Sequence, residues 1–438
     1  MQTKLRLTVI SMFLVCLLLL VSGISYASDY VPRPGVLSPD QVDFGGKTVT
    51  ILVRDLDWVV HNGGKPLPER VAEAEALYNV KIQTMDPGTV ENIMSRIMAN
   101  DSTYDIIRIN HRNAFFPLVT AGMLYPVSQI LPKEYFESLP APDRYSIEKL
   151  RYQGELYGVG IVYGLFNGSM MITMYNKDLI EREGLEDPYQ LWKEGRWTYE
   201  AMEQIGIALT KDTDGDGEID QWGIGALGYP FGIYRVAPSN GAEIAKPDES
   251  GRWVYTFNSP EAIYVLNTLA RWQNELQIVG GGDFNLGTVG IIPQTHLAGA
   301  RHALAAGVNV GYVPQPRGPH VDSHQWPTFD FSMNMIPINA EYPEGLIALI
   351  DFLFREEDGE EYLDFYINSY MTSREHAEVY MTGAEEWKGE GDPFQNSGLW
   401  DIVDGAVNAV MRGEKGAAVA MDEIAQQAQA FLDDLFNQ

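Results

Sequence analysis

The sequence has 438 residues, of which 45% are hydrophobic, and its 60 acidic and 31 basic residues give a formal net charge of −29. A chain this acidic repels the phosphates of nucleic acids and anionic membrane surfaces, so we expect no nucleic-acid partner, and solubility in an exposed compartment explains the charge. Its length and hydrophobic content suffice for about two or three domains with large buried cores.

The first residues have the pattern of an export signal. Two basic residues, Lys4 and Arg6, precede the uncharged stretch Leu7–Tyr26, and Ser25-Tyr26-Ala27 has the small-x-small form that a signal peptidase accepts. We therefore expect residues 1–27 to be removed as a signal peptide, with the mature chain periplasmic or secreted. An uncleaved transmembrane anchor is the alternative, because about 20 apolar residues can span a bilayer.

The only cysteine, Cys16, lies within this predicted signal. The mature chain would then have neither a disulfide nor a reactive thiol. A lipid-attachment site requires a small residue directly before the cysteine, whereas Val15 stands there. We therefore do not expect a lipid anchor.

After a leader at residues 28–46 that is rich in Pro, Gly and Asp, strand-like and helical segments alternate. Strands are predicted at Lys47–Val53, Val80–Thr84 and Asp105–Ile109, and helices at Pro66–Tyr78, Glu91–Ala99 and Ala114–Ala121. Such alternation is typical of a mostly parallel sheet covered by helices.

A second α/β region is predicted from Ser169 to Pro327. It contains a strand at Met170–Tyr175 and helices at Lys177–Glu183, Thr198–Leu209 and Pro260–Leu276. A further strand is predicted at Phe331–Ile338 and a helix from Pro343, a position where the missing N–H of proline does no harm. Two helices end the chain, and the second has one apolar face made of Ile424, Ala428, Phe431, Leu432 and Leu435.

Three motifs follow one another between residues 174 and 224. Tyr175-Asn176-Lys177-Asp178 ends a predicted strand, Gly195-Arg196-Trp197-Thr198 opens a helix, and an acidic loop leads into Gln221-Trp222-Gly223. In this order and spacing they resemble the family 1 extracellular solute-binding proteins, the sugar-binding components of ABC importers. Gly154–Gly158 and Val313–Pro319 resemble further segments of that family, whereas residues 280–294 and 380–395 match no pattern of it.

The resemblance implies an α/β fold of type II periplasmic-binding-protein-like architecture. Its two lobes, each a mostly parallel sheet flanked by helices, would be joined by a multi-strand hinge. We expect the N-terminal lobe to comprise residues 47–165 and 332–370, and the C-terminal lobe residues 166–331 and 371–438. The implied function is that of a monomeric binding protein without catalytic activity, which closes on a monosaccharide or oligosaccharide and delivers it to a membrane ABC permease.

Ligand contacts are expected at strand ends that face the space between the lobes. Sugar binding uses aromatic rings against C–H surfaces and planar polar groups for hydroxyls. The candidates are Asp55, Trp58, Asn110, Arg112, Tyr163, Asn167, Tyr229, Phe231, Trp326 and Trp400. For each of them the alternative is ordinary packing, because most large aromatic side chains are largely buried.

The acidic loop has most of a calcium-binding pattern. Asp212, Asp214, Asp216 and Asp220 fit positions 1, 3, 5 and 9 of a calcium loop, and Glu218 stands at the position that supplies a backbone carbonyl. Position 12 is Gly223, so the usual bidentate carboxylate is missing. Either another carboxylate completes a structural Ca²⁺ site, or the segment is a turn stabilised by its own side-chain-to-backbone hydrogen bonds.

Other functions remain as alternatives. A secreted glycoside hydrolase would need two carboxylates flanking one bond, and Glu385-Glu386-Trp387 offers only neighbours that point in different directions. Neither an HExxH nor a G-x-S-x-G motif occurs. A binding protein for a non-sugar solute, or one that reports to a membrane receptor, would share the same sequence features.

Overall fold

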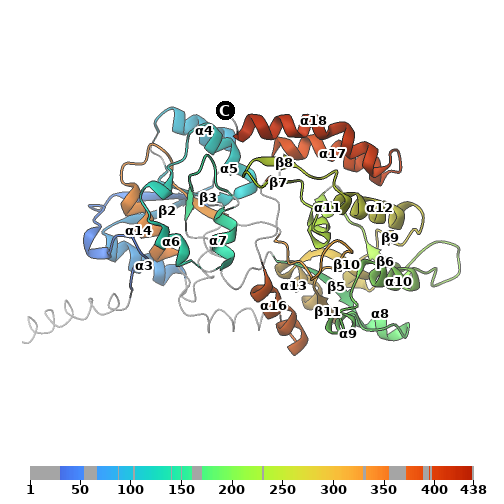
Figure 1. Cartoon of the computed structure of the whole chain (residues 1–438). Helices are drawn as coiled ribbons and strands as arrows, with labels where there is room; N and C mark the ends of the chain where they lie inside the picture. Colours follow the sequence, from blue (N-terminus) through green and yellow to red (C-terminus); the bar gives the residue numbers. More distant parts are fainter. Residues whose placement is uncertain are drawn as a thin grey trace, which may run out of the picture.

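The computed structural model of the chain describes residues 30–436, except 54–66, 87, 102–103, 140, 149, 160–169, 229–230, 329–331, 355–370, 388–393 and 395–396. The described elements form two α/β lobes, each built on a five-stranded sheet (Figure 1). In this part of the chain no helix has the length and apolar character needed to cross a membrane.

The first lobe is built on the sheet β2-β1-β3-β12-β4. Its strands are β1 (Thr48–Leu52), β2 (Lys81–Met85), β3 (Ile106–Asn110), β4 (Gly158–Val159) and β12 (Ser332–Met335). β1 pairs in parallel with β2 and β3, whereas β12 runs antiparallel to β3 and β4. Its helices are α3 (Leu67–Tyr78), α4 (Val90–Met98), α5 (His111–Thr120), α6 (Lys133–Glu137), α7 (Ala141–Glu148) and α14 (Pro343–Leu353), with short 3₁₀ turns η1 (Pro39–Gln41) and η3 (Val127–Gln129).

The second lobe is built on the sheet β11-β5-β10-β6-β9. Its strands are β5 (Met171–Asn176), β6 (Trp222–Gly225), β9 (Val279–Gly280), β10 (Val289–His296) and β11 (Val310–Val313), and β7 (Ala245–Pro247) and β8 (Trp253–Tyr255) form a separate hairpin. The helices are α8 (Lys177–Arg182), α9 (Pro188–Lys193), α10 (Tyr199–Leu209), α11 (Phe231–Val236), α12 (Pro260–Asn274), α13 (Leu297–Ala305) and α16 (Arg374–Glu386), with 3₁₀ turns η4 (Ala237–Asn240) and η5 (Phe284–Leu286).

Both sheets are mixed but mostly parallel, as expected, because only β12 in the first sheet and only β5 in the second run against the other four strands. In each, two neighbouring pairs are parallel and two are antiparallel. The reason lies in the connections between lobes. β12 enters the first sheet only after the chain has built the second, and it arrives from the edge at which β3 ends. It must therefore run against β3.

The chain passes between the lobes three times. It leaves the first sheet after Val159, enters the second at Met170, and returns between Thr328 and β12. The ends of these two passages pair with each other, Val159 with Asn334 and Met170 with Thr328. The third passage lies between α14, which packs on α3, and α16, which packs on β11. The expected lobe boundaries fall within or beside undescribed stretches, so these boundaries stay predictions.

The leader and the C-terminal helices complete the two lobes. Val42 and Phe44 of the leader are buried in the core of the first lobe. α17 (Gly398–Met411) and α18 (Ala417–Phe436) pack against each other, and Figure 1 shows α18 reaching back toward the first lobe. The predicted apolar face of α18 is confirmed, since Ala428 and Leu432 are buried and the rest of that face packs on the core.

Candidate functional site

The strand directions bring one edge of each sheet together. β4 and β3 both run antiparallel to β12, so they are parallel to each other and end at the same edge. In the second sheet β5 runs antiparallel to both β10 and β11, so β5 begins where those strands end. The passage from β4 to β5 therefore joins the carboxyl edges of the two sheets. Ligands of open α/β sheets bind outside such carboxyl edges.

The first lobe presents the ends of β1 and β3 at this place. Asn110 is the last residue of β3 and pairs with Ser332, and Arg112 lies in the first turn of α5. Both candidates therefore stand at the carboxyl edge. Asp55 and Trp58, expected just after β1, lie outside the described residues.

The second lobe contributes polar groups that the sequence analysis did not select. The Gln294 side-chain amide donates to the carbonyl of Ala226, which follows β6, at 2.8 Å. Arg235 of α11 donates through Nη1 to the Gln294 carbonyl at 3.4 Å. The backbone N–H of Gly299 donates to Nδ1 of His296 at 3.1 Å, so His296 caps α13 at the end of β10. The Gln294 and Arg235 side chains therefore bond to backbone groups at the ends of β6 and β10, and His296 bonds to the start of α13.

The sequence analysis predicted no strand at the position of β10, so Gln294 and His296 had no strand end to mark them. Gln294 and His296 fall in or just after the stretch that matched no family pattern, and no aromatic residue marks them. Phe231 opens α11, the helix that follows β6 in the chain, and its contact with a ligand stays a prediction. Tyr229, Tyr163 and Asn167 lie outside the described residues.

Of the three tryptophan candidates, the two that the structure describes, Trp326 and Trp400, are buried. Trp326 is fully buried beside the second passage, and its indole N–H donates to Oε2 of Glu386 at 2.9 Å. Trp400 is 5% exposed, and its ring lies 4.4 Å from that of Tyr234. A ligand would reach either indole only after movement of its neighbours. Contact with a ligand stays a prediction for both.

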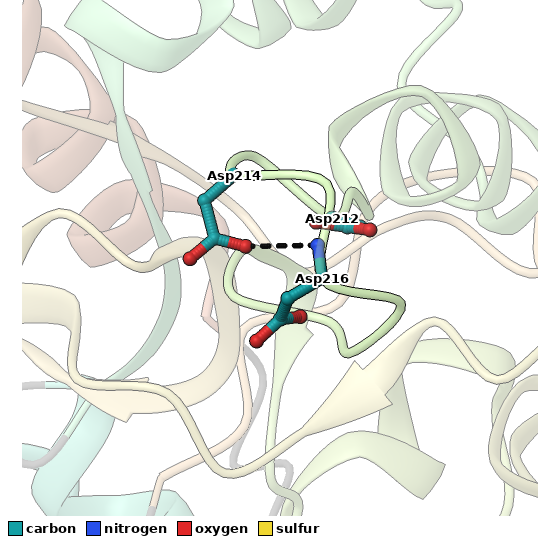
Figure 2. Close-up of side chains that lie close together, drawn as sticks. All are labelled: Asp212, Asp214 and Asp216. Carbon is teal, nitrogen blue, oxygen red and sulfur yellow. Dashed lines mark hydrogen bonds between the residues drawn. The ribbon is translucent and has the colours of Figure 1, made fainter.

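The acidic loop brings three carboxylates together, as Figure 2 shows. One carboxylate oxygen from each of Asp212, Asp214 and Asp216 lies within 4.8 Å of the others. Asp214 also accepts a hydrogen bond from the N–H of Asp216 at 3.1 Å. Carboxylate oxygens are the ligands that calcium prefers, so this group could hold a hard cation.

The same loop satisfies many of its own hydrogen bonds. Asp212 accepts from the N–H groups of Gly217 and Gly215 at 2.8 and 2.6 Å, and these bonds hold the pKa of Asp212 below its ordinary value. Asp220 accepts from the N–H and hydroxyl of Thr213, which likewise lowers its pKa. The N–H of Glu218 donates to Asp216 at 2.8 Å. The three central carboxylates therefore come together, while Asp220 bonds to Thr213.

Two cavities lie elsewhere. One of about 430 Å³ lies between α12 and the connection from α17 to α18, with Arg271 and Lys415 in its lining. The other, about 280 Å³, lies at the amino end of β1 and is lined by Asp43, Lys47 and Asp105. The second is therefore at the opposite end of β1 from the carboxyl edge.

No protein-family model and no curated protein matches the sequence. Solved structures do match the fold. A cyclo/maltodextrin-binding protein complexed with maltotetraose is 18% identical, with a TM-score of 0.63 over 88% of this chain and 97% of its own. An ABC substrate-binding protein from Listeria monocytogenes, in complex with cycloalternan, is 17% identical, with a TM-score of 0.61 over 89% and 98% of the two chains.

The chain has the fold of the ABC substrate-binding proteins. A solute-binding protein of an ABC transporter from Thermotoga lettingae, bound with α-D-tagatose, agrees at 13% identity, with a TM-score of 0.59 over 88% of this chain and all of its own. The matches extend over nearly the whole length of each solved protein, so both lobes of the substrate-binding fold are present. This confirms the two-lobed α/β fold that the motifs between residues 174 and 224 predicted.

Proposed function

We propose that the chain is an extracytoplasmic binding protein that captures a monosaccharide or oligosaccharide between its lobes and delivers it to a membrane ABC permease. The observation that carries this proposal is the strand topology, in which the passage from β4 to β5 joins the carboxyl edges of the two sheets. Hinge rotation about the three passages would bring the polar groups of these edges together around a solute.

The chemistry of the second lobe's edge supports a sugar as the solute. Gln294 and His296 lie at the end of β10, and Arg235 donates to the Gln294 carbonyl; planar amide and guanidinium groups suit pairs of hydroxyls. The matched structures carry maltotetraose, cycloalternan and tagatose. To these three residues we add, as proposed contacts, Asp55, Trp58, Asn110, Arg112, Tyr163, Asn167, Tyr229, Phe231, Trp326 and Trp400.

The carboxylates of Glu385 and Glu386 fit a binding protein better than a glycosidase. Glu385 and Glu386 are neighbours at the end of α16, and Glu386 accepts the indole hydrogen bond of Trp326. A glycosidase needs two carboxylates about 5 to 9.5 Å apart, one on each side of the bond to be cleaved. A pair adjacent in sequence, with one member bound to a buried tryptophan, does not meet that requirement.

The remaining parts of the proposal concern location and a cation. Residues 1–27 would direct export and be removed, which would leave a periplasmic or secreted monomer.

Asp212, Asp214 and Asp216 would hold Ca²⁺, with Glu218 supplying its backbone carbonyl and the Asp220 side chain turning away from Thr213 to complete the site. The ion would act structurally, because it would fix the connection between α10 and β6 and no reacting group lies on that loop.

A thermal-shift screen tests the binding role. The mature chain is heated with maltotetraose, cycloalternan, tagatose and a set of other solutes that includes peptides and polyamines. A sugar bound with micromolar or tighter affinity should raise Tm by several degrees at millimolar concentration, because it binds only the folded state. Gln294→Ala should reduce this shift, whereas Gln190→Ala, on the exposed surface of α9, should not.

The other outcomes are distinct. A shift with a peptide or polyamine and none with any sugar would replace the sugar by another solute. The appearance of hydrolysis products, without a shift, would replace the binding role by an enzymatic one.

A further inference from the structure

Aromatic rings from both lobes meet at the C-terminal end of α18. Phe116 of α5 and Tyr152 belong to the first lobe, whereas Trp253 of β8, Phe394 and Phe436 of α18 belong to the second. We call these five residues the aromatic bridge. Figure 1 shows the end of α18 beside α5 and the β7–β8 hairpin.

Three ring contacts in the aromatic bridge connect the lobes. Phe116 and Phe394 are stacked, with ring centroids 5.1 Å apart and planes 7° from parallel. Phe436 meets Phe116 edge to face at 5.9 Å, and its ring lies 6.0 Å from that of Tyr152 with the planes tilted by 50°. Phe394 is fully buried and Phe116 is 6% exposed, so these contacts exclude water. Such pairs stabilise a contact beyond the area that they bury.

The second lobe holds its half of the bridge firmly. Trp253 stacks on Phe436 at 5.4 Å and meets Phe394 at 4.9 Å. Gln429 lies about two helical turns before Phe436. Its side-chain amide donates to the Trp253 carbonyl at 3.1 Å and accepts from the N–H of Tyr255 at 2.9 Å. The end of α18 is therefore fixed to the β7–β8 hairpin. Phe436 therefore reaches the first lobe from a helix that is hydrogen-bonded to this hairpin.

A hinge rotation that separates the lobes must break or slide the ring contacts that connect them. A contact made in only one arrangement favours that arrangement by the free energy that it contributes there. We propose that the aromatic bridge is an interlobe latch, which favours the lobe arrangement seen here even without a ligand. The latch rests on the hinge motion of the proposed function, but it requires no sugar.

Distances between spin labels in the two lobes test the latch. The mature chain lacks cysteine, so labels can be attached to Met98→Cys on α4 and Leu286→Cys on η5, which are 69% and 78% exposed. Without ligand, Phe436→Ala should move the distance distribution to longer values and broaden it. The ratio of molecules with the latch formed to molecules with separated lobes should fall about tenfold, because the variant loses the ring contacts of Phe436 with Phe116 and Tyr152.

A control variant lies on the same helix. Phe431 packs on Gly398 of α17 in the second lobe, so Phe431→Ala removes a ring of the same size that is not part of the three interlobe ring contacts named above. It should leave the distances unchanged. Phe116→Leu weakens the latch from the other side, keeps an apolar side chain in the first lobe, and should shift the distances as Phe436→Ala does.

The latch would be overturned if Phe436→Ala and Phe116→Leu both kept the parental distances, or if they shortened them. Before labelling, circular dichroism spectra of each variant are compared with that of the parent to check that the variant is folded. Because the measurement uses no ligand, a failure of sugar binding would not affect it.

Discussion

The Asp351 carboxylate lies on α14 with none of its side chain exposed. Arg33 of the leader pairs with it at 2.7 Å, and the Tyr30 hydroxyl donates to it at 2.6 Å. A charge buried this deeply is tolerated only when it is paired and hydrogen-bonded. This contact therefore fastens the leader to the first lobe.

Arg33→Ala should destabilise the protein by about 3 to 5 kcal/mol, because it leaves the Asp351 carboxylate buried without its ion pair. Urea unfolding of the mature chain measures this loss. The matched control is Lys47→Ala, since Lys47 and Glu341 form a pair at 3.0 Å whose side chains are 71% and 75% exposed. That change should cost less than about 1 kcal/mol. Equal losses from the two variants would contradict this account of the leader.

For single residues, the sequence predicted the position within a strand or helix better than the neighbours that the residue has in the folded chain. Asn110 could be assigned to a strand end because the apolar run before it predicts a strand at Asp105–Ile109. Gln294 could not, because its place depends on the pairing of β10 with β6, which are joined in the register Val289 to Trp222. The sequence next to Gln294 does not indicate which distant strand β10 pairs with.

Among the elements, those with local signals were predicted closely. Thr198 caps α10 by accepting from the N–H of Ala201, and Ser259 with Pro260 begins α12. α5 begins at His111, three residues before the prediction, because its polar first turn hides the start of the apolar face. The mixed strand directions could not be read from the sequence, since apolar strands look alike in either direction.

The acidic loop between α10 and β6 gives a prediction at the scale of one element. Calcium should raise the Tm of the mature chain, and a chelator should reverse this, because the ion would bind only the folded loop. Asp214→Asn should abolish the calcium effect, since it removes one of three converging carboxylates.

Asp248→Asn is the control for the loop. Asp248 also accepts backbone hydrogen bonds in an exposed turn, from Ser250 at 2.8 Å, but it lies outside the group of three. Its variant should respond to calcium as the parent does. A Tm that calcium leaves unchanged would show that the loop is a turn held by its own hydrogen bonds.

At the scale of the molecule, function depends on how two sheets are joined. The motifs between residues 174 and 224 predicted a two-lobed fold because they recur together in one family. They could not predict that Phe116, Phe394 and Phe436 meet, since these residues are brought together by the relative position of the lobes. The same holds for the polar groups at the carboxyl edges, which belong to separate strands and helices.

Isothermal titration calorimetry tests the central claim most directly. The mature chain is titrated with the carbohydrate that gives the largest thermal shift, and the sugar is then recovered and analysed by chromatography. We predict saturable one-to-one binding with a Kd of micromolar or below, and a sugar recovered unchanged. The absence of saturable heat with every carbohydrate, or the recovery of a shortened sugar, would contradict the claim that this protein binds a sugar without transforming it.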